Sequence, residues 1–179
     1  VKNPVLIRTH VGAELNDITA QQLIQDDNYR IISGSVLDGR SMNRFFAWLG
    51  RFHRQVTVLP ENKKRSFLGW TFPGFRSFSL TRTVAASFLP VKRLHFTTSS
   101  QGDRRAVVPI GSYEKVMPLD IEPTFLFRSL YAGDIDQAEK LGCLELAEED
   151  LALCTVVCPG KNDFGVMLRR MLDRIEKEG

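Results

Sequence analysis

The sequence predicts an α+β protein, in which a β-grasp unit of the soluble-ligand-binding kind, with a β-rich extension, spans residues 1–117 and a small helical domain spans 118–179. Short runs of β-branched residues flank a helical stretch near the start of the chain. From Pro118 onward, apolar residues recur at helical spacing instead. The charge also divides near residue 120: residues 1–120 carry a net charge of +8 and the remainder −5, which indicates two domains.

The first unit is expected to contain a strand, a helix and a second strand. Residues 5–11 are rich in β-branched side chains and predict a strand that ends before Gly12. Thr19 is a candidate helix N-cap, with Gln22 at the matching position of a capping box. Residues 29–33 predict the second strand, and the glycine-containing pairs that follow it have turn chemistry.

The extension is predicted to be rich in strands. Residues 55–59 and 65–70 flank a Pro-Glu-Asn-Lys turn and predict a hairpin. Residues 94–98 alternate in polarity and predict a further strand, with 106–110 as its returning partner. Glycine and proline interrupt the segment 70–78, which we interpret as an exposed aromatic loop or a strand corner.

Helix signals dominate the C-terminal domain. Pro123 fits the first position of a helix that Gly133 ends, because glycine readily adopts the left-handed conformation found there. Asp134 is expected to cap the next helix. Acidic residues at 148–150 open a third helix, where carboxylates complement the helix dipole. Apolar residues between 164 and 175 recur at spacings of three and four and predict the last helix.

The most informative motif is the pair Cys154 and Cys158 with Pro159, because C-x3-C-P is the end of the iron–sulfur pattern C-x2-C-x2-C-x3-C-P. The cysteines that begin this pattern are missing, and Cys143 is the only other cysteine. Three thiolates cannot supply the usual four-cysteine ligation of one cluster, so we predict a vestigial scaffold and no metal bound by this chain alone. Two alternatives stay open: a structural pair of buried cysteines before a proline helix stop, and a cluster completed by another chain.

The composition excludes several classes of protein. No apolar run approaches the roughly 18 residues that span a bilayer, and an odd number of irregularly spaced cysteines argues against a secreted disulfide scaffold. The start at Val1, without a methionine or a signal-peptide pattern, indicates a fragment of a longer chain. We expect a soluble protein from a reducing compartment, with any membrane association peripheral.

No catalytic or cofactor-binding residue is predicted. His10, His53 and His95 each stand alone, outside any zinc-binding pattern. A serine-nucleophile elbow, a Walker loop and a dinucleotide fingerprint are all absent from the sequence. Isolated histidines of this kind are usually structural.

Basic residues are concentrated between Arg40 and Arg105, where 13 lysines and arginines face only Glu61 and Asp103. Such a field attracts nucleic acid, anionic lipid or an acidic protein surface. Aromatic residues interleaved with arginines also occur in grooves that bind single strands, so a basic nucleic-acid-binding module is the alternative function. A protein–protein or membrane-surface dock is favoured over it. The interleaved aromatic residues are Phe45, Phe46, Trp48, Phe52, Trp70, Phe72 and Phe75.

Short motifs that agree in order and spacing carry a family resemblance over essentially the whole chain. They lie at residues 30–37, 67–70, 108–111, 116–120, 148–154 and 157–161. Together they resemble the C-terminal part of the A subunit of the bacterial sodium-translocating NADH:quinone reductase. The resemblance implies a fragment that is not catalytic alone but supports assembly, and the quinone-reducing end, of a six-subunit enzyme complex that oxidises NADH, reduces ubiquinone and exports sodium.

The resemblance also implies where this region works and what it holds. It implies a peripheral component of the cytoplasmic face of the bacterial inner membrane, whose partners are the other subunits of the complex, one of them membrane-embedded. The flavin and cluster sites of related electron-transport subunits are degenerate in this family. No cofactor is therefore expected in this fragment, and ubiquinone is expected only as a substrate of the whole complex.

The basic segment offers a docking surface for such a component. Arginines without acidic neighbours orient a protein against anionic lipid headgroups or an acidic loop of a membrane partner. Each contributes about 1 kcal/mol near an anionic surface. The candidates for this surface are Arg51, Arg54 and Arg76.

Overall fold

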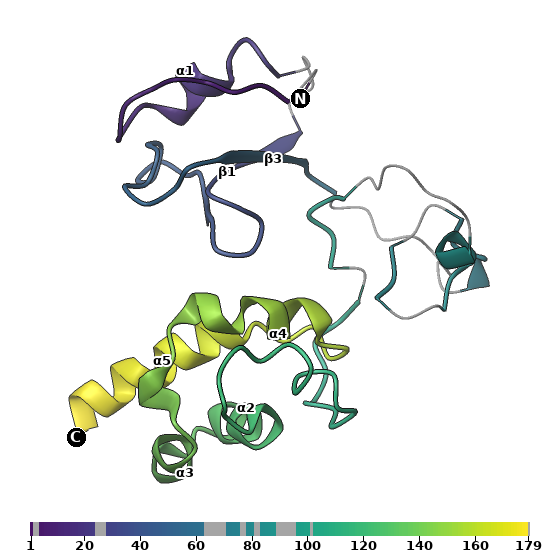
Figure 1. Cartoon of the computed structure of the whole chain (residues 1–179), viewed down its shortest axis with the longest axis vertical. Helices are drawn as coiled ribbons and strands as arrows, with labels where there is room; N and C mark the ends of the chain where they lie inside the picture. Colours follow the sequence, from purple (N-terminus) through teal and green to yellow (C-terminus); the bar gives the residue numbers. More distant parts are fainter. Residues whose placement is uncertain are drawn as a thin grey trace. The chain divides into compact units, whose positions relative to one another are not determined.

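A computed structural model describes most of the chain as two compact units, Val1–Gln101 and Gly102–Gly179 (Figure 1). The described residues are 1, 4–23, 28–62, 71–75, 78–80, 83–88, 96–100 and 102–178. The first unit holds a small antiparallel sheet and the second holds most of the helices. The predicted α+β class is therefore confirmed, while the β-grasp arrangement of the first unit stays a prediction.

The sheet of the first unit has three strands in the order β2-β1-β3. The central strand is β1 (Tyr29–Ser33), which pairs antiparallel with β2 (Arg40–Ser41) and β3 (Val56–Pro60). Ile31 lies opposite Val58 in this register. The predicted strand at 29–33 is confirmed, and the strand predicted at 55–59 lies one residue further along the chain.

The first helix lies earlier than its predicted cap. α1 covers Leu15–Thr19, so Thr19 is its last residue and not the residue before its start. The Thr19 hydroxyl donates a hydrogen bond back to the Leu15 carbonyl at 2.8 Å, which leaves it no role as an N-cap. Leu15 is fully buried, and this burial favours a helix at its position over one that begins after Thr19.

Two of the predicted strands are wrong, and others lie outside the described residues. Residues 5–11 form no strand, and 106–110 form none either. Both segments have β-branched residues, yet neither is paired with a strand in the described part of the chain, and a strand is stable only when paired. Residues 96–98 also form no strand, while 94 and 65–70 are not among those described.

The helices of the second unit begin and end where the local signals predict. α2 (Pro123–Ala132) starts at its proline and stops at Gly133, whose φ is 74°. α3 (Ile135–Lys140) is capped by Asp134, whose Oδ1 accepts a hydrogen bond from the Gln137 amide at 3.1 Å. Both terminal predictions are therefore confirmed.

The rest of the second unit is built from shorter turns and one long helix. Two 3-10 turns, η3 (Cys143–Glu145) and η4 (Glu148–Leu151), lead into α4 (Ala152–Val157). The predicted third helix is thus a 3-10 turn followed by a short α-helix, and it ends before Pro159 as expected. α5 (Phe164–Glu178) is the predicted last helix. No described helix combines the length and apolar character that crossing a membrane requires.

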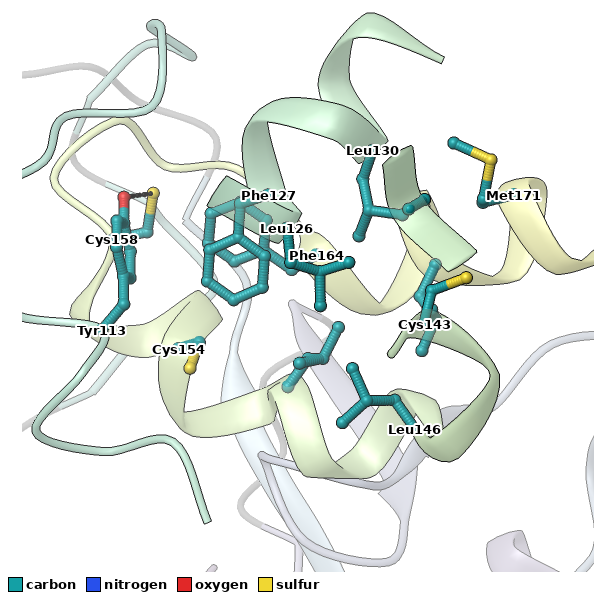
Figure 2. Packing of buried hydrophobic residues seen from close by; sticks show 13 residues of the cluster. Tyr113, Leu126, Phe127, Leu130, Cys143, Leu146, Cys154, Cys158, Phe164 and Met171 are labelled. Atoms are coloured by element: carbon teal, nitrogen blue, oxygen red, sulfur yellow. Dashed lines mark hydrogen bonds between the residues drawn. The ribbon is translucent and has the colours of Figure 1, made fainter. Parts of the chain in front are cut away.

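An aromatic cluster forms the centre of the second unit (Figure 2). Phe127 of α2 and Phe164 of α5 stack with their ring centroids 3.7 Å apart. Tyr113 meets both rings edge-on, at 5.1 and 5.5 Å. All three side chains are fully buried, and burying each contributes roughly 2–3 kcal/mol.

The segment before the helices belongs to this packing. Besides Tyr113, the half-buried Val107, Val116 and Met117 pack against the same cluster. The compact unit accordingly begins at Gly102. The domain boundary predicted between 117 and 118 stays a prediction.

Candidate functional site

The three cysteines are free thiols inside the second unit. Cys143 lies at the start of η3, Cys154 in α4 and Cys158 directly after α4, and each is at least 99% buried. Among the described residues, no group of three or more histidine, cysteine or carboxylate side chains is placed to hold a metal ion. The surroundings of the cysteine pair consist of hydrogen bonds and apolar packing.

The sulfur of Cys158 is the meeting point of three polar groups. The Tyr113 hydroxyl lies 3.2 Å from it (Figure 2). The Asn162 backbone N–H donates to it at 3.4 Å, and the Asn162 side-chain amide donates at 3.8 Å. Burial, together with this contact to Cys158, raises the pKa of Tyr113 well above its ordinary value. The thiol therefore serves as a buried hydrogen-bonding partner that joins distant parts of the unit.

The turn after Cys158 binds the backbone of residues 105–106. The Arg105 N–H donates to the Gly160 carbonyl at 2.7 Å, and the Asn162 side chain donates to the Arg105 carbonyl at 2.8 Å. A Cβ atom on Gly160 would lie 2.7 Å from the Ala106 carbonyl oxygen. The glycine is therefore required by close approach of backbone. The residues around the C-P motif thus form a turn that binds the Arg105–Ala106 backbone.

The other two thiols lie in apolar surroundings. Burial raises the pKa of Cys154 from 9.0 to about 11, with a smaller contribution from Glu114. Burial also raises the pKa of Cys143, with a smaller contribution from Glu139. Because the thiolate is the nucleophile and the metal ligand, these shifts favour the protonated form of both thiols near neutral pH.

In the first unit, Ser33 at the end of β1 holds the loop that follows β2. Its Oγ accepts a hydrogen bond from the Gly50 N–H at 2.9 Å and lies 2.7 Å from His53 Nδ1. The backbone N–H of His53 donates a hydrogen bond to the Gly50 carbonyl at 3.0 Å. Ser33 is only 3% exposed. This buried hydroxyl consequently fixes the position of the loop against the sheet.

The same loop is also attached to the start of the chain. The Leu15 N–H donates to the Ala47 carbonyl at 2.8 Å, and the Leu49 N–H donates to the Ala13 carbonyl at 2.9 Å. These bonds form an antiparallel bridge between Glu14 and Trp48. Since alternate side chains point to opposite sides of such a pairing, burying Leu15 leaves Trp48 on the outer side.

Residues 40–54, which comprise β2 and the loop that follows it, present aromatic rings and arginines to solvent, and we call this segment the aromatic–arginine loop. Phe52 is 86% exposed, Phe45 79%, Trp48 55% and Phe46 46%. The Arg40 guanidinium lies 4.8 Å from the centre of the Phe46 ring. The exposed arginines of the loop are Arg40, Arg44, Arg51 and Arg54.

The predicted docking residues fall partly on this loop. Arg51 and Arg54 are exposed within it, and the Arg51 guanidinium lies 5.8 Å from the centre of the Phe52 ring. Arg76 lies outside the described residues, so its place relative to the other two stays a prediction. The sequence pattern identified the arginines but not Ser33 or His53, whose pairing joins residues 20 positions apart.

Of the other residues singled out in the sequence, His10 is exposed and His95 lies outside the described part of the chain. Tyr113 was not identified either. Its partner Cys158 is 45 positions away, and no local spacing signals a contact over that distance.

Comparisons with known proteins agree on one family. A family model described as the NQRA C-terminal domain matches residues 1–44. Proteins named as the A subunit of Na(+)-translocating NADH-quinone reductase, which we call NQRA, are similar over all 179 residues: that of Tolumonas auensis is 56% identical, that of Klebsiella pneumoniae 54% and that of Pasteurella multocida 56%. The chain spans 40% of the length of each of these relatives.

Proposed function

This chain belongs to the NQRA family of Na(+)-translocating NADH-quinone reductase, and on that premise we propose that it works as the C-terminal region of NQRA. The observation that carries the proposal is an identity of 54–56% maintained over the full 179 residues. Identity of this extent preserves the fold, so the region and its relatives are expected to share one role.

In this role the region is a part of an enzyme without catalytic residues of its own. The whole complex oxidises NADH, reduces ubiquinone and exports sodium, and the region supports its assembly and its quinone-reducing end. The burial of all three free thiols supports a structural contribution. No cofactor is assigned to the region itself.

We assign the first unit a β-grasp fold, which is a finer description than a mixed sheet and helix. The family match at residues 1–44 lies within this unit, and its antiparallel sheet with a short helix before β1 is compatible with such a fold. The helical domain would then carry the degenerate cluster scaffold around Cys154 and Cys158.

We further propose that the region belongs to a peripheral component on the cytoplasmic face of the bacterial inner membrane. Its partners are the other subunits, one of them membrane-embedded, and an anionic membrane surface is a further candidate. Arg51, Arg54 and Arg76 form the proposed docking surface. The exposure of Arg51 and Arg54 supports their part in it.

The two alternatives are less well supported. None of the three relatives named above has a name that refers to nucleic acid, so the basic charge alone favours a nucleic-acid-binding module. A cluster completed by another chain would need exposed cysteine sulfurs at an interface between chains, whereas Cys154 and Cys158 are buried.

Deletion of this region from full-length NQRA tests the proposal. The complex would be purified through a tag on another subunit, from cells with full-length or shortened NQRA. We expect shortened NQRA to be lost from the complex, together with NADH-dependent quinone reduction. Copurification of shortened NQRA with full quinone reductase activity would refute the supporting role.

A further inference from the structure

The aromatic–arginine loop is built as a recognition surface before any partner arrives. Its four aromatic side chains are between 46% and 86% exposed, and exposed apolar side chains of this size, gathered in one loop, usually mark an interaction site. The loop is held at four positions. Ala47 and Leu49 form backbone hydrogen bonds with the start of the chain, and Gly50 and His53 contact Ser33. The rings are therefore presented on a fixed scaffold, which lowers the entropic cost of binding.

The charges of the loop identify the kind of partner. Between residues 39 and 60 there are four arginines, no lysine and no acidic residue. None of the ion pairs found in the described residues uses these arginines. The acidic residues next to the loop are not in ion pairs with these arginines: Glu61 pairs with Arg30, Asp38 accepts hydrogen bonds from Ser35, and Glu14, opposite Trp48, accepts one from Asn16. The loop thus has a set of guanidinium groups that these neighbouring acids do not neutralise.

Arginine and lysine differ in what they recognise. A planar guanidinium binds a carboxylate through two parallel hydrogen bonds and stacks on aromatic rings, as Arg40 and Arg51 do here. Anionic lipid headgroups attract lysine equally well. Tryptophan, aromatic residues generally and arginine are also the residues enriched at the centres of protein–protein interfaces. The exclusive use of arginine favours a polypeptide over a bilayer.

We propose that the aromatic–arginine loop binds a segment of another subunit of the complex, one that carries Asp or Glu side chains beside apolar residues. The aromatic rings pack on the apolar residues, and Arg44, Arg51 and Arg54 pair with the carboxylates. The proposal rests on the proposed function, because it takes the chain to be part of NQRA. It adds to that function the chemistry of the partner and the residues that contact it.

Zero-length cross-linking in the intact complex tests this proposal and identifies the partner. Arg51→Lys and Arg54→Lys keep the charge and supply an amine that a carbodiimide joins to a carboxylate in direct contact. We expect cross-links, located by mass spectrometry, to Asp or Glu of another subunit. Arg30→Lys is the matched control, since Arg30 contacts Glu61 of its own unit at 2.7 Å and should cross-link internally.

Each other result of this experiment contradicts the proposal. Cross-links from positions 51 and 54 only to NQRA itself would assign the loop to another part of the same chain. An absence of cross-links while the Arg30→Lys control reacts would show that no carboxylate lies at the loop. The proposed function fails in a different way, through copurification of shortened NQRA with full quinone reductase activity, so the two failures can be told apart.

Hydroxyl-radical footprinting tests the aromatic half of the interface without any substitution. We expect Phe45, Trp48 and Phe52 to be oxidised in isolated full-length NQRA and to lose most of that oxidation in the detergent-solubilised complex. Protection already present in the isolated protein would contradict the proposal. Protection that appears only after addition of phosphatidylglycerol vesicles would assign the loop to lipid and equally contradict it.

Discussion

Because the thiol of Cys154 is buried, the stability of the second unit is expected to fall as the pH becomes alkaline. Its pKa is raised by burial from 9.0 to about 11, so the folded state keeps the proton that the unfolded chain releases. The stabilising effect is complete below pH 9 and is lost as the pH rises through about 11. A shift of two units corresponds to roughly 2–3 kcal/mol.

We expect the urea concentration that unfolds the second unit in NQRA to fall between about pH 8 and about pH 10, as followed by helical circular dichroism. Cys154→Ala should remove the part of this fall that belongs to Cys154. An identical pH dependence in the variant would show that the thiol is not shielded from solvent in the folded state.

Removing the Ser33 hydroxyl should release the aromatic–arginine loop. Ser33→Ala leaves the Gly50 N–H and His53 Nδ1 without their partner, and losing a buried hydrogen bond of this kind costs about 1–3 kcal/mol. We expect faster hydrogen exchange at Gly50 and His53. Ser35→Ala, at a half-buried residue whose hydroxyl binds Asp38, is the control and should leave these two amides unchanged.

For single residues, the sequence predicted which side chains are candidates for a role better than it predicted which residues they contact. The arginines at 51 and 54 were identified as exposed docking candidates because uncompensated charge is visible in composition. The roles of Ser33, His53 and Tyr113 were not, because each depends on a contact between segments 20 or 45 positions apart. Such contacts leave no periodic pattern in a single sequence.

Close backbone packing at Gly160 gives a prediction at the level of elements. In Gly160→Ala the new Cβ would lie 2.7 and 2.9 Å from the carbonyl oxygens of Ala106 and Arg105, so one of the two backbones must move. We expect a loss of about 1–3 kcal/mol and faster exchange at the Arg105 amide, which donates to the Gly160 carbonyl.

Gly102→Ala is the control for this substitution. Its Cβ would meet only the flexible side chain of Lys161, at 3.4 Å. Stability should therefore change little. Equal losses in the two variants would show that alanine itself, and not the approach of the Arg105–Ala106 backbone, is responsible.

In the second unit, elements with local end signals were predicted well, whereas the cap predicted at Thr19 in the first unit was wrong. Pro123, Gly133 and Asp134 mark the ends of α2 and α3 because capping acts within a few residues. The strands predicted at 5–11 and 106–110 failed because β-branched residues favour a strand only where a partner is available. In the second case, Val107 packs on the helical cluster instead.

The domain organisation can be tested with two fragments. A fragment of residues 102–179 retains Tyr113, whereas one of 118–179 lacks it together with the Arg105 backbone that binds Gly160 and Asn162. Removing a buried aromatic side chain costs about 3–5 kcal/mol. We expect the longer fragment to melt cooperatively at a higher temperature, and equal melting would favour the boundary predicted at 117/118.

For the whole molecule, the sequence predicted the fold class and the family, and both are confirmed. The division near residue 120 was inferred from charge, which reports on surfaces. The boundary at 117/118 stays a prediction, while the compact unit that begins at Gly102 includes Tyr113, which packs on the rings at 127 and 164. Packing of this kind depends on three-dimensional contacts that a change in net charge does not reveal.

The position of Tyr113 also has a consequence for how the protein is made. The chain leaves the ribosome from its N-terminus, so Tyr113 emerges before Phe127 and well before Phe164, the two rings that enclose it. Until α5 has been synthesised, Tyr113 and its neighbours lack the Phe164 ring that packs against them. The second unit therefore cannot complete its folding until α5 has been synthesised, and a ribosome that stalls before it adds Phe164 would expose an unfinished aromatic core to chaperones and proteases.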